Sequence, residues 1–446
     1  MTGSLTLVGA SRLVERFDHA AGDRDGTLVV REGRVVEEAA LHTPPDEVLD
    51  AEGGIVTPGL INAHHHLLQS GFRTLPGTRG VPMREWLPAM AAAYATAGID
   101  ASLVGATAAV GLAESLLCGV TTVADHQLNW PDPSVSDDPV GDTVSLARAI
   151  AGAAATLGAR LVFVRGAARD APDLAAASAE AIVQDLLPTN PPGGTTADGM
   201  LQLAVGPAGV HSDGAETFHA LGEVARRHGL RRRTQANEQV DTEIALARYG
   251  RRPLDLLEDW GWLEPDVTIA HLCDVTRDEI TRLGTAGVSA THAPGCDVPM
   301  GWGVAPVRIL RESGIAVGLG TSGGGSNDAG HLLADARLAM QVSGLVGDAL
   351  PARDVLAMAT SEGAAGLGRP DLGTLSPGAA GDFCVWDVSG VADAGVADPV
   401  AGLLWARPGR RPRHVVVAGR VVVRDYRLTT SDERALVDTL RARVGR

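Results

Sequence analysis

The stretch Val56-Thr-Pro-Gly-Leu-Ile-Asn-Ala-His-His-His66 places three histidines directly after a short apolar run. Residues 55–62 have the pattern of a buried β-strand that ends just before these histidines. His64 and His66 lie two residues apart, so both imidazoles are expected on the same side of the extended chain. The stretch therefore predicts a strand that ends in two side chains able to bind one ligand together.

Outward from this stretch, short apolar runs alternate with segments of helix length. Helical periodicity is clear at 143–157 and 332–341. Eight strands are expected, at 55–62, 120–125, 160–165, 201–205, 231–236, 267–271, 288–292 and 316–321. This alternation is typical of the α/β class, and eight repeats predict a (β/α)8 TIM barrel.

The two ends of the chain have β-hairpin patterns. Residues 27–37 turn at Glu32-Gly33, and residues 414–424 turn at Ala418-Gly419. A capping box, Thr430-Ser-Asp-Glu433, is expected to open a C-terminal helix. We therefore expect a small composite β-sandwich formed from both termini, residues 1–58 and 371–446, with the barrel at 59–370.

Polar side chains gather where the predicted strands end. In a barrel of this kind, the C-terminal ends of the strands meet at one face, where active sites lie. Gln235 and Glu238 follow the fifth strand, and Ser322 follows the eighth. The chain has 13 histidines, and many fall at these ends, namely His64, His65, His66, His126, His271 and His292.

Three of these histidines fit a catalytic zinc site. His64 and His66 come from the first strand and His271 from a strand across the barrel, and three neutral imidazoles leave one position open for water. Glu238 is placed to act as general base and acid for that water. The same spacing also fits a solvated polar turn at 64–66 and a hydrogen-bonded buried His271.

Further motifs occur in a characteristic order. Besides 56–66, they are Gly119-Val-Thr-Thr-Val-Ala-Asp-His126, Ile269-Ala-His271, Gly318-Leu-Gly-Thr321, Ser326-Asn-Asp328 and Gly378-Ala-Ala-Gly-Asp-Phe-Cys-Val-Trp-Asp387. Over essentially the whole chain this set resembles the amidohydrolase superfamily, in particular its cytosine/guanine deaminase and chlorohydrolase branch. Met300-Gly-Trp-Gly-Val-Ala-Pro306 is similar to the s-triazine hydrolases, and residues 64–69 with Arg73 are similar to the 8-oxoguanine deaminases.

The resemblance implies a hydrolase with one zinc ion per subunit, or Fe²⁺ or Mn²⁺, acting on a nitrogen-rich heteroaromatic ring. Metal-bound hydroxide would attack an amidine-like ring carbon while Glu238 shuttles the proton, and deamination is favoured over dehalogenation. By position, the metal ligands are His64, His66, Gln235 and His271, and the catalytic residues are Glu238, His292 and Ser322. The implied substrate-binding residues are Gln69, Arg73, Trp86, Asp125, His126, Gln127, Trp302 and Asn327.

Two positions depart from the pattern of the resembled family. Its fifth-strand histidine is Gln235 here, and its eighth-strand aspartate is Ser322. A Gln amide oxygen is a weaker zinc donor than imidazole, so we expect reduced affinity, another metal or loss of the metal. His211, beyond the fourth strand, is a candidate replacement ligand. Arg165, at the end of the third strand, is expected to form a structural salt bridge rather than to bind an acidic substrate group.

The composition excludes several other functions. With 446 residues and a net charge of −16, the chain offers no basic face for nucleic acid, and the Arg231–Arg233 triplet is interpreted as a solvated turn. Because no lysine occurs, Schiff-base chemistry and a lysine carbamate between two metals are excluded. No membrane-spanning run or signal-peptide pattern is found, and the four cysteines are widely spaced. We expect a cytoplasmic homodimer that binds a small heteroaromatic molecule and neither nucleic acid nor membrane.

Two alternatives stay open from the residues alone. Gln235 and Ser322 favour altered, non-hydrolytic or metal-free chemistry on the same fold, in a biosynthetic pathway. The other alternative is a catalytically silent binding protein. Retention of Glu238 argues against a silent protein, because a buried carboxylate without a partner is costly.

Overall fold

One parallel sheet of nine strands is found in the computed structural model, which describes residues 3–37 and 44–445. The strands are β6 (Leu60–His66), β7 (Val120–Gln127), β8 (Arg160–Ala167), β9 (Leu201–Pro207), β10 (Arg231–Ala236), β11 (Val267–His271), β12 (Ser289–His292), β13 (Val317–Leu319) and β14 (Ser322–Gly323). They pair in chain order from β6 to β13, and β14 returns to β6 through Ser322↔His65. Since β13 and β14 are two halves of one strand, this pairing closes the sheet, and the predicted (β/α)8 barrel is confirmed.

The eighth strand is split where it passes β6. A Cβ atom built on Gly320 would lie 2.7 Å from the carbonyl oxygen of His64, so the close approach requires glycine. Asn62 donates a 2.7 Å hydrogen bond to the hydroxyl of Thr321, and Ser322 takes a φ of 52°. The predicted continuous strand at 316–321 is therefore wrong in detail, because the contact with β6 interrupts it.

The first predicted strand is also two strands. β5 (Ile55–Pro58) pairs with β1 and β15 of the terminal sheet, whereas β6 begins the barrel at Leu60. A side chain at Gly59 would overlap the side chain of Thr121, which explains why glycine stands at this junction. The chain therefore passes from one sheet to the other within a single residue.

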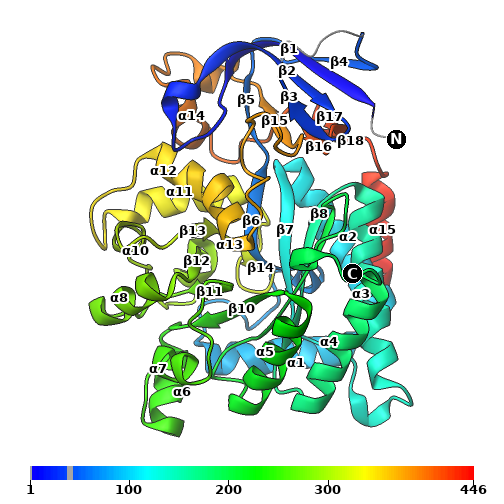
Figure 1. The fold of residues 1–446 in the computed structure, drawn as a ribbon, viewed down its shortest axis with the longest axis vertical. Helices are drawn as coiled ribbons and strands as arrows, with labels where there is room; N and C mark the ends of the chain where they lie inside the picture. The colour runs from blue at the N-terminus through cyan, green and yellow to red at the C-terminus, as the bar shows by residue number, and fades with distance from the viewer. Residues whose placement is uncertain (1–2, 38–43, 446) are drawn as a thin grey trace.

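A second sheet combines both ends of the chain and lies beyond one end of the barrel (Figure 1). Its strands are β1 (Ser4–Leu13), β2 (Arg24–Arg31), β3 (Arg34–Val36), β4 (Glu47–Asp50), β5, β15 (Phe383–Trp386), β16 (His414–Val417), β17 (Arg420–Arg424) and β18 (Arg427–Leu428). The hairpins predicted at Glu32-Gly33 and Ala418-Gly419 are confirmed, with positive φ at all four turn residues. Residues 1–2, 38–43 and 446 of the predicted terminal segments lie outside the described residues.

Helices cover the barrel and flank the terminal sheet (Figure 1). They are α1 (Met83–Ala97), α2 (Ala101–Leu117), α3 (Pro139–Leu157), α4 (Pro172–Leu186), α5 (Ala215–His228), α6 (Val240–Tyr249), α7 (Pro253–Asp259), α8 (Arg277–Ala286), α9 (Pro294–Asp297), α10 (Val307–Glu312), α11 (Leu332–Ser343), α12 (Ala352–Ala357), α13 (Gly363–Leu367), α14 (Pro399–Trp405) and α15 (Glu433–Val444). Within the described part of the chain, no single helix is long and apolar enough to cross a bilayer. The pair α1 and α2 reaches that length and composition together but is bent by 118°.

Two local predictions are wrong. The C-terminal helix is capped by Asp432, whose carboxylate accepts hydrogen bonds from the amides of Arg434 and Ala435, and not by Thr430. The arginine triplet is the start of β10 and not a solvated turn, because Arg233 points into the barrel and is 3% exposed. Its guanidinium donates to the carbonyl of Ala63, so the barrel interior directly below the strand ends carries a positive charge.

Candidate active site

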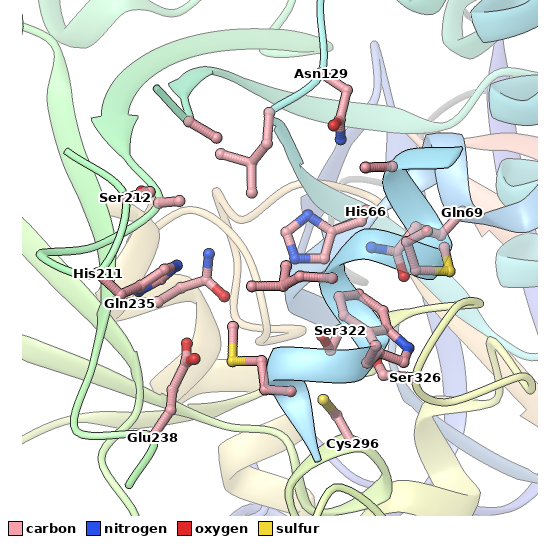
Figure 2. A pocket seen from close by; sticks show the side chains of 18 of the residues that line it. His66, Gln69, Asn129, His211, Ser212, Gln235, Glu238, Cys296, Ser322 and Ser326 are labelled. Carbon is pink, nitrogen blue, oxygen red and sulfur yellow. The ribbon is translucent and has the colours of Figure 1, made fainter. Parts of the chain in front are cut away.

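A cavity opens at the C-terminal ends of the barrel strands (Figure 2). One wall is apolar and comes from α1, with Met83, Trp86, Leu87, Met90 and Tyr94. The facing wall is polar, with Asn129, Arg169, His211 and Ser212. Other lining residues include His66, Gln69, Gln235, Glu238, Cys296, Trp302, Ser322 and Ser326. The cavity therefore joins an aromatic surface to a cluster of polar groups at the strand ends.

The three imidazoles predicted as metal ligands come together in the structure. The ring centroids of His64 and His66 are 4.8 Å apart, and those of His64 and His271 are 5.3 Å apart. Burial lowers the pKa of His66 to about 4, and burial together with the neighbouring imidazoles holds the pKa of His64 well below its usual value. Both rings are therefore neutral at neutral pH, which is the form that binds a metal ion.

Hydrogen bonds behind two of the rings fix which nitrogen faces the cluster. The Nδ1–H of His66 donates to the carbonyl of His126 at 2.7 Å, which leaves its Nε2 with a free lone pair. Nδ1 of His271 lies 2.6 Å from Oδ1 of Asp297. Such contacts to a carbonyl or a carboxylate are typical of histidines that ligate a metal through the other nitrogen.

Nε2 of His271 faces two oxygen atoms. The amide oxygen of Gln235 is 3.1 Å away, and Oε1 of Glu238 is 3.6 Å away. Burial opposes protonation of His271, but the carboxylates of Asp297 and Glu238 outweigh it and raise its pKa. An imidazole nitrogen, an amide oxygen and a carboxylate oxygen that face one another are stabilised by a shared cation, which is a proton on His271 or a metal ion.

Glu238 is held in the cavity by a strained turn. Asn237 and Gln239, its two neighbours, have φ values of 57° and 63°, and the backbone amide of Asn237 donates to Asp241 at 2.9 Å. The Glu238 side chain is 1% exposed, and neither of its oxygens has a hydrogen-bond partner among residues 3–37 and 44–445. Burial raises its pKa, against the opposing charges of His271 and His211. Strain and an unpaired buried acid at one position are characteristic of functional sites.

His211 lines the cavity on the same wall as Gln235 (Figure 2). Its Nδ1 lies 3.3 Å from Oδ1 of Asp241. Burial opposes its protonation, but the hydrogen bond to Asp241 and the nearby Glu238 raise its pKa overall. His211 is therefore placed near the predicted ligand Gln235, as the candidate replacement must be, but its Nδ1 already contacts a carboxylate.

The residues predicted as metal ligands include one neutral amide, Gln235. Among the described residues, no three His, Cys, Asp or Glu side chains alone form an arrangement that could hold a metal ion. Nε2 of His64 is buried and without a partner in that same part of the chain. This orphaned nitrogen, with the lone pairs of His66 and His271 and the Gln235 oxygen, makes a nitrogen-rich set suited to a borderline-soft divalent ion.

Three of the predicted substrate-binding residues line the cavity. Gln69 and Trp86 both bond to Gly325, since the Gln69 side-chain oxygen accepts from its amide at 2.9 Å and the Trp86 indole donates to its carbonyl at 3.0 Å. The ring of Trp302 lies edge-on to His271, with centroids 5.1 Å apart. These residues place two indole rings close to the polar cluster.

Two other predicted substrate-binding residues are engaged elsewhere. Arg73 donates to both carboxylate oxygens of Glu114 on α2. The Asn327 amide donates to the carbonyl of Thr321 at 3.1 Å and to both oxygens of Asp335. Neither side chain lines the cavity in the described structure. Each donates its hydrogen bonds to a carboxylate or a carbonyl of a neighbouring segment instead.

The second-strand motif supports its neighbours rather than lining the cavity. Oδ1 of Asp125 accepts from the amide of Leu67 at 2.8 Å, and Nε2 of His126 donates to the carbonyl of Gly206 at 2.9 Å. The Gln127 amide donates to the carbonyl of Asn129. In the structure these three side chains hold the backbone around His66 and the polar wall, and their predicted contact with substrate stays a prediction.

The family of the chain follows from comparison with known proteins. The amidohydrolase family pattern matches residues 55–422. The chain belongs to the amidohydrolase family. It is 32% identical over 435 residues to the 8-oxoguanine deaminase of Pseudomonas aeruginosa, with 94% of each chain covered. It is also 32% identical over 446 residues to a 5-methylthioadenosine/S-adenosylhomocysteine deaminase of Halobacterium salinarum, covering 98% of this chain and 96% of the relative.

A solved structure shows the same fold. The atrazine chlorohydrolase TrzN from Arthrobacter aurescens TC1, crystallised in complex with zinc, is 30% identical, with a TM-score of 0.87 over 99% of this chain and 100% of that one. The amidohydrolase family is metal-dependent, and these relatives are hydrolases of carbon–nitrogen or carbon–chlorine bonds in cyclic compounds. The predicted superfamily and class of enzyme are confirmed.

In this amidohydrolase, His292 and Arg165 both lie outside the first cavity. His292 lines a second cavity, with residues of α10 and α11, and its Nδ1 lies 3.7 Å from Oδ2 of Asp297. It therefore stands behind Asp297 rather than at the first cavity. Arg165 bonds to Asp170 at 2.7 Å and to the hydroxyl of Ser178 at 2.9 Å, and it is 2% exposed, so its predicted structural role agrees with its contacts.

Asp297 is the main residue that the sequence reasoning missed. It lies five residues beyond β12, where its charge close to a strand-end histidine was a usable signal. The apolar wall on α1 was missed in all but Trp86, because apolar helix residues have the pattern of ordinary core positions.

Proposed function

We propose that this amidohydrolase is a metal-dependent deaminase that hydrolytically removes an amino group from a nitrogen-rich heteroaromatic ring. The observation that carries the proposal is Glu238, whose two buried oxygens have no hydrogen-bond partner in the described chain and lie beside His271 and Gln235. Burying an acid without a partner costs free energy, and a water or substrate that completes its hydrogen bonds explains why the site keeps it.

His64, His66, His271 and Gln235 would hold the metal, with zinc as the first candidate and iron or manganese as alternatives. When bound, it supplies Lewis acidity that lowers the pKa of a water molecule in the cavity. The neutral state of His64 and His66 at neutral pH suits this role. Gln235 and Ser322 lower the number of charged or imidazole donors, so affinity is weaker than that of a site with four strong ligands.

Glu238 takes up a proton from the attacking water and passes it to the departing amine. One group serves in both steps because it stands within reach of the strand-end cluster, and its raised pKa lets the carboxyl hold the proton between them. The nearby hydroxyl of Ser322 lines the same cavity and is available to bind a ring substituent. His292 does not line it, so its predicted direct contact with water or substrate is not part of the proposal.

The cavity wall favours a flat aromatic substrate. The chain has only seven Trp, three Tyr and five Phe, and two of the tryptophans and one tyrosine line this cavity. Indole and phenol faces bind flat rings by stacking and by apolar burial. The polar side chains of Asn129, His211 and Ser212 on the facing wall suit the ring nitrogens and exocyclic groups of such a substrate.

The experiment is turnover of aminated and chlorinated purines, pyrimidines and triazines in ¹⁸O-labelled water. The proposal predicts release of ammonia from an aminated ring and one ¹⁸O atom per product molecule. Chloride release with the same labelling would assign dehalogenation instead. Turnover that leaves the product unlabelled would overturn hydrolysis and favour the non-hydrolytic alternative, for which Gln235 and Ser322 are the motivation.

We also propose a cytoplasmic homodimer with the domain limits 58/59 and 370/371. All four cysteines are free in the described structure, which suits a reducing compartment. Analytical ultracentrifugation checks the oligomeric state, for which a mass of two subunits is expected.

A further inference from the structure

A buried carboxylate lies directly behind His271. Asp297, the last residue of α9, is 0% exposed, and its Oδ1 is 2.6 Å from Nδ1 of His271. His271 and the next residue, Leu272, have φ values of 76° and 54°. The end of β11 is therefore bent into an unfavourable backbone conformation that coincides with the short contact between the His271 ring and Asp297.

The second oxygen of Asp297 faces another imidazole. Oδ2 lies 3.7 Å from Nδ1 of His292, and neither atom has a hydrogen-bond partner among the residues that the structure describes. The carboxylate thus stands between two histidines, in hydrogen-bond contact with only one of them. His292, on the far side, lines the second cavity and not the first.

We infer that Asp297 is a positioning residue for the reaction proposed above, on which this inference rests. It accepts the Nδ1–H of His271 and so directs the Nε2 lone pair toward Gln235 and Glu238. Through the imidazole it also supplies negative charge to a site in which Ser322 provides no carboxylate. His292 lies 3.7 Å from the other oxygen of Asp297, on the side away from His271.

A buried positive charge near the site explains why the negative charge of Asp297 matters for binding a metal ion. Arg233 places a buried cation in the barrel interior, near enough to His64 and His126 to lower the pKa of each. A cation below the site weakens the binding of a second one. A carboxylate hydrogen-bonded to a metal-ligating histidine makes that ligand more basic, and Asp297 therefore offsets part of this repulsion.

A purely structural role makes a different prediction. If the contact between Asp297 and His271 only ties α9 to β11, its loss lowers stability and leaves metal affinity per folded molecule unchanged. If Asp297 positions the ring, metal affinity and kcat fall even in a variant that remains folded. Asp382 is a matched control, because it is 4% exposed, accepts hydrogen bonds from Arg160 and lies at the opposite end of the barrel.

The test compares Asp297→Asn and Asp297→Ala with Asp382→Asn in the full chain as purified. Zinc affinity is measured by chelator competition, and kcat and KM are measured on whichever substrate the panel identifies. We expect Asp297→Ala to lower zinc affinity by about 10- to 100-fold and kcat with it, with KM little changed. Asp297→Asn should retain more of both, and Asp382→Asn should stay within about twofold of wild type in zinc affinity.

A readout independent of activity separates this inference from the proposed function. In ¹⁵N-histidine NMR spectra of the wild type, assigned with His271→Gln, His271 is expected to carry its proton on Nδ1, and Asp297→Ala should change that signal. A wild-type His271 protonated only on Nε2, or zinc affinity unchanged in a folded Asp297→Ala variant, would overturn the inference. A wild-type protein whose His271 carries its proton on Nδ1 but which turns over no substrate would refute the proposed function and leave the inference about Asp297 standing.

Discussion

At the base of the barrel, Arg160 and Asp382 are 3% and 4% exposed, which is close to the burial of Glu238 and Asp297 at the mouth. Nε and Nη2 of Arg160 donate to the two oxygens of Asp382 at 2.6 and 2.9 Å, and Asp382 also accepts from the amide of Ala418. At the mouth, both oxygens of Glu238 and Oδ2 of Asp297 have no hydrogen-bond partner within the described chain. The carboxylates at the two ends of the barrel are thus equally buried, but only the one at the base has all its hydrogen bonds made.

This difference separates charges that hold the fold from charges that serve chemistry. A buried pair with all its hydrogen bonds made fixes the junction between the barrel and the terminal sheet. Unpaired buried groups are rare in native proteins and need an explanation. For Glu238, which lines the cavity, the explanation is a partner from outside the chain. Substitutions at the two ends of the barrel should therefore affect different measured quantities.

The largest effect is expected from Glu238→Gln at the mouth. Loss of the proton shuttle should lower kcat by about 10²- to 10⁴-fold. Because burial raises the pKa of Glu238, replacing the carboxylate by a neutral amide should not destabilise the fold. At pH values above 7, the variant should therefore unfold at a temperature no lower than that of the wild type. Steady-state kinetics and a thermal melt measure the two quantities, and a kcat within twofold of wild type would contradict the role given to Glu238.

Asp382→Asn at the base should show the reverse pattern. Removing one partner of a buried ion pair leaves Arg160 unpaired and should cost about 3–5 kcal/mol in the free energy of unfolding. The kcat of the folded fraction should not change, since the pair lies at the end of the barrel away from the cavity. Urea unfolding and steady-state kinetics on the same sample test this. An Asp382→Asn variant that is as stable as the wild type but has lost turnover would contradict the division between charges that hold the fold and charges that serve chemistry.

The fold was largely predictable from local patterns. Eight apolar runs and two turn dipeptides, Glu32-Gly33 and Ala418-Gly419, determine strands and hairpins through neighbouring residues alone. The breaks at Gly59 and at 320–321 were missed, because each depends on a strand distant in the sequence that passes close by. The cap at Asp432 was missed because a motif with the right letters stood two residues earlier.

The site was predictable only in part. Strand periodicity brings His64 and His66 to one side, and the end of β10 brings Gln235 and Glu238 to the same mouth. The position of Asp297 depends on the backbone bend after His271, which no spacing rule contains. The sequence does not show the contacts of Arg73 with Glu114 and of Asn327 with Asp335. Substrate binding by Arg73 and Asn327 therefore stays a prediction.

Asp335 is a third type of buried carboxyl group, because all its hydrogen bonds come from neutral donors. Burial raises its pKa to about 7, against hydrogen bonds from Asn327 and the amide of Gly295. Between its ordinary pKa near 4 and 7, the folded state keeps a proton that the unfolded state has lost, so stability falls as pH rises, by at most about 1.4 kcal/mol per pH unit. Asp335→Asn should flatten this slope.

Urea unfolding of wild type and Asp335→Asn at pH 4 to 8 measures the difference. The two stabilities should diverge with rising pH, in favour of the variant, and become parallel above pH 7. Identical slopes in the two proteins would show that Asp335 is ionised at low pH, and that its three hydrogen bonds pair it as fully as Arg160 pairs Asp382.

The smallest effect is expected from Arg73→Met. The ion pair between Arg73 and Glu114 is 30% and 26% exposed, and partly exposed pairs contribute about 0–1 kcal/mol. KM for the identified substrate should stay within twofold of wild type, because the guanidinium faces α2. A KM increase of tenfold or more, measured beside an unchanged melt, would restore Arg73 as a substrate-binding residue.

The central claim is that the cluster of His64, His66, His271 and Gln235 at the mouth holds a metal ion beside Glu238. The most direct test is the metal content of the purified, unchelated protein by inductively coupled plasma mass spectrometry, beside a His64→Ala/His66→Ala variant. We predict near-stoichiometric zinc, or iron or manganese, in the wild type and its loss in the variant. A wild type without metal, even after growth with added zinc, would contradict the account and favour metal-free chemistry around Gln235 and Ser322.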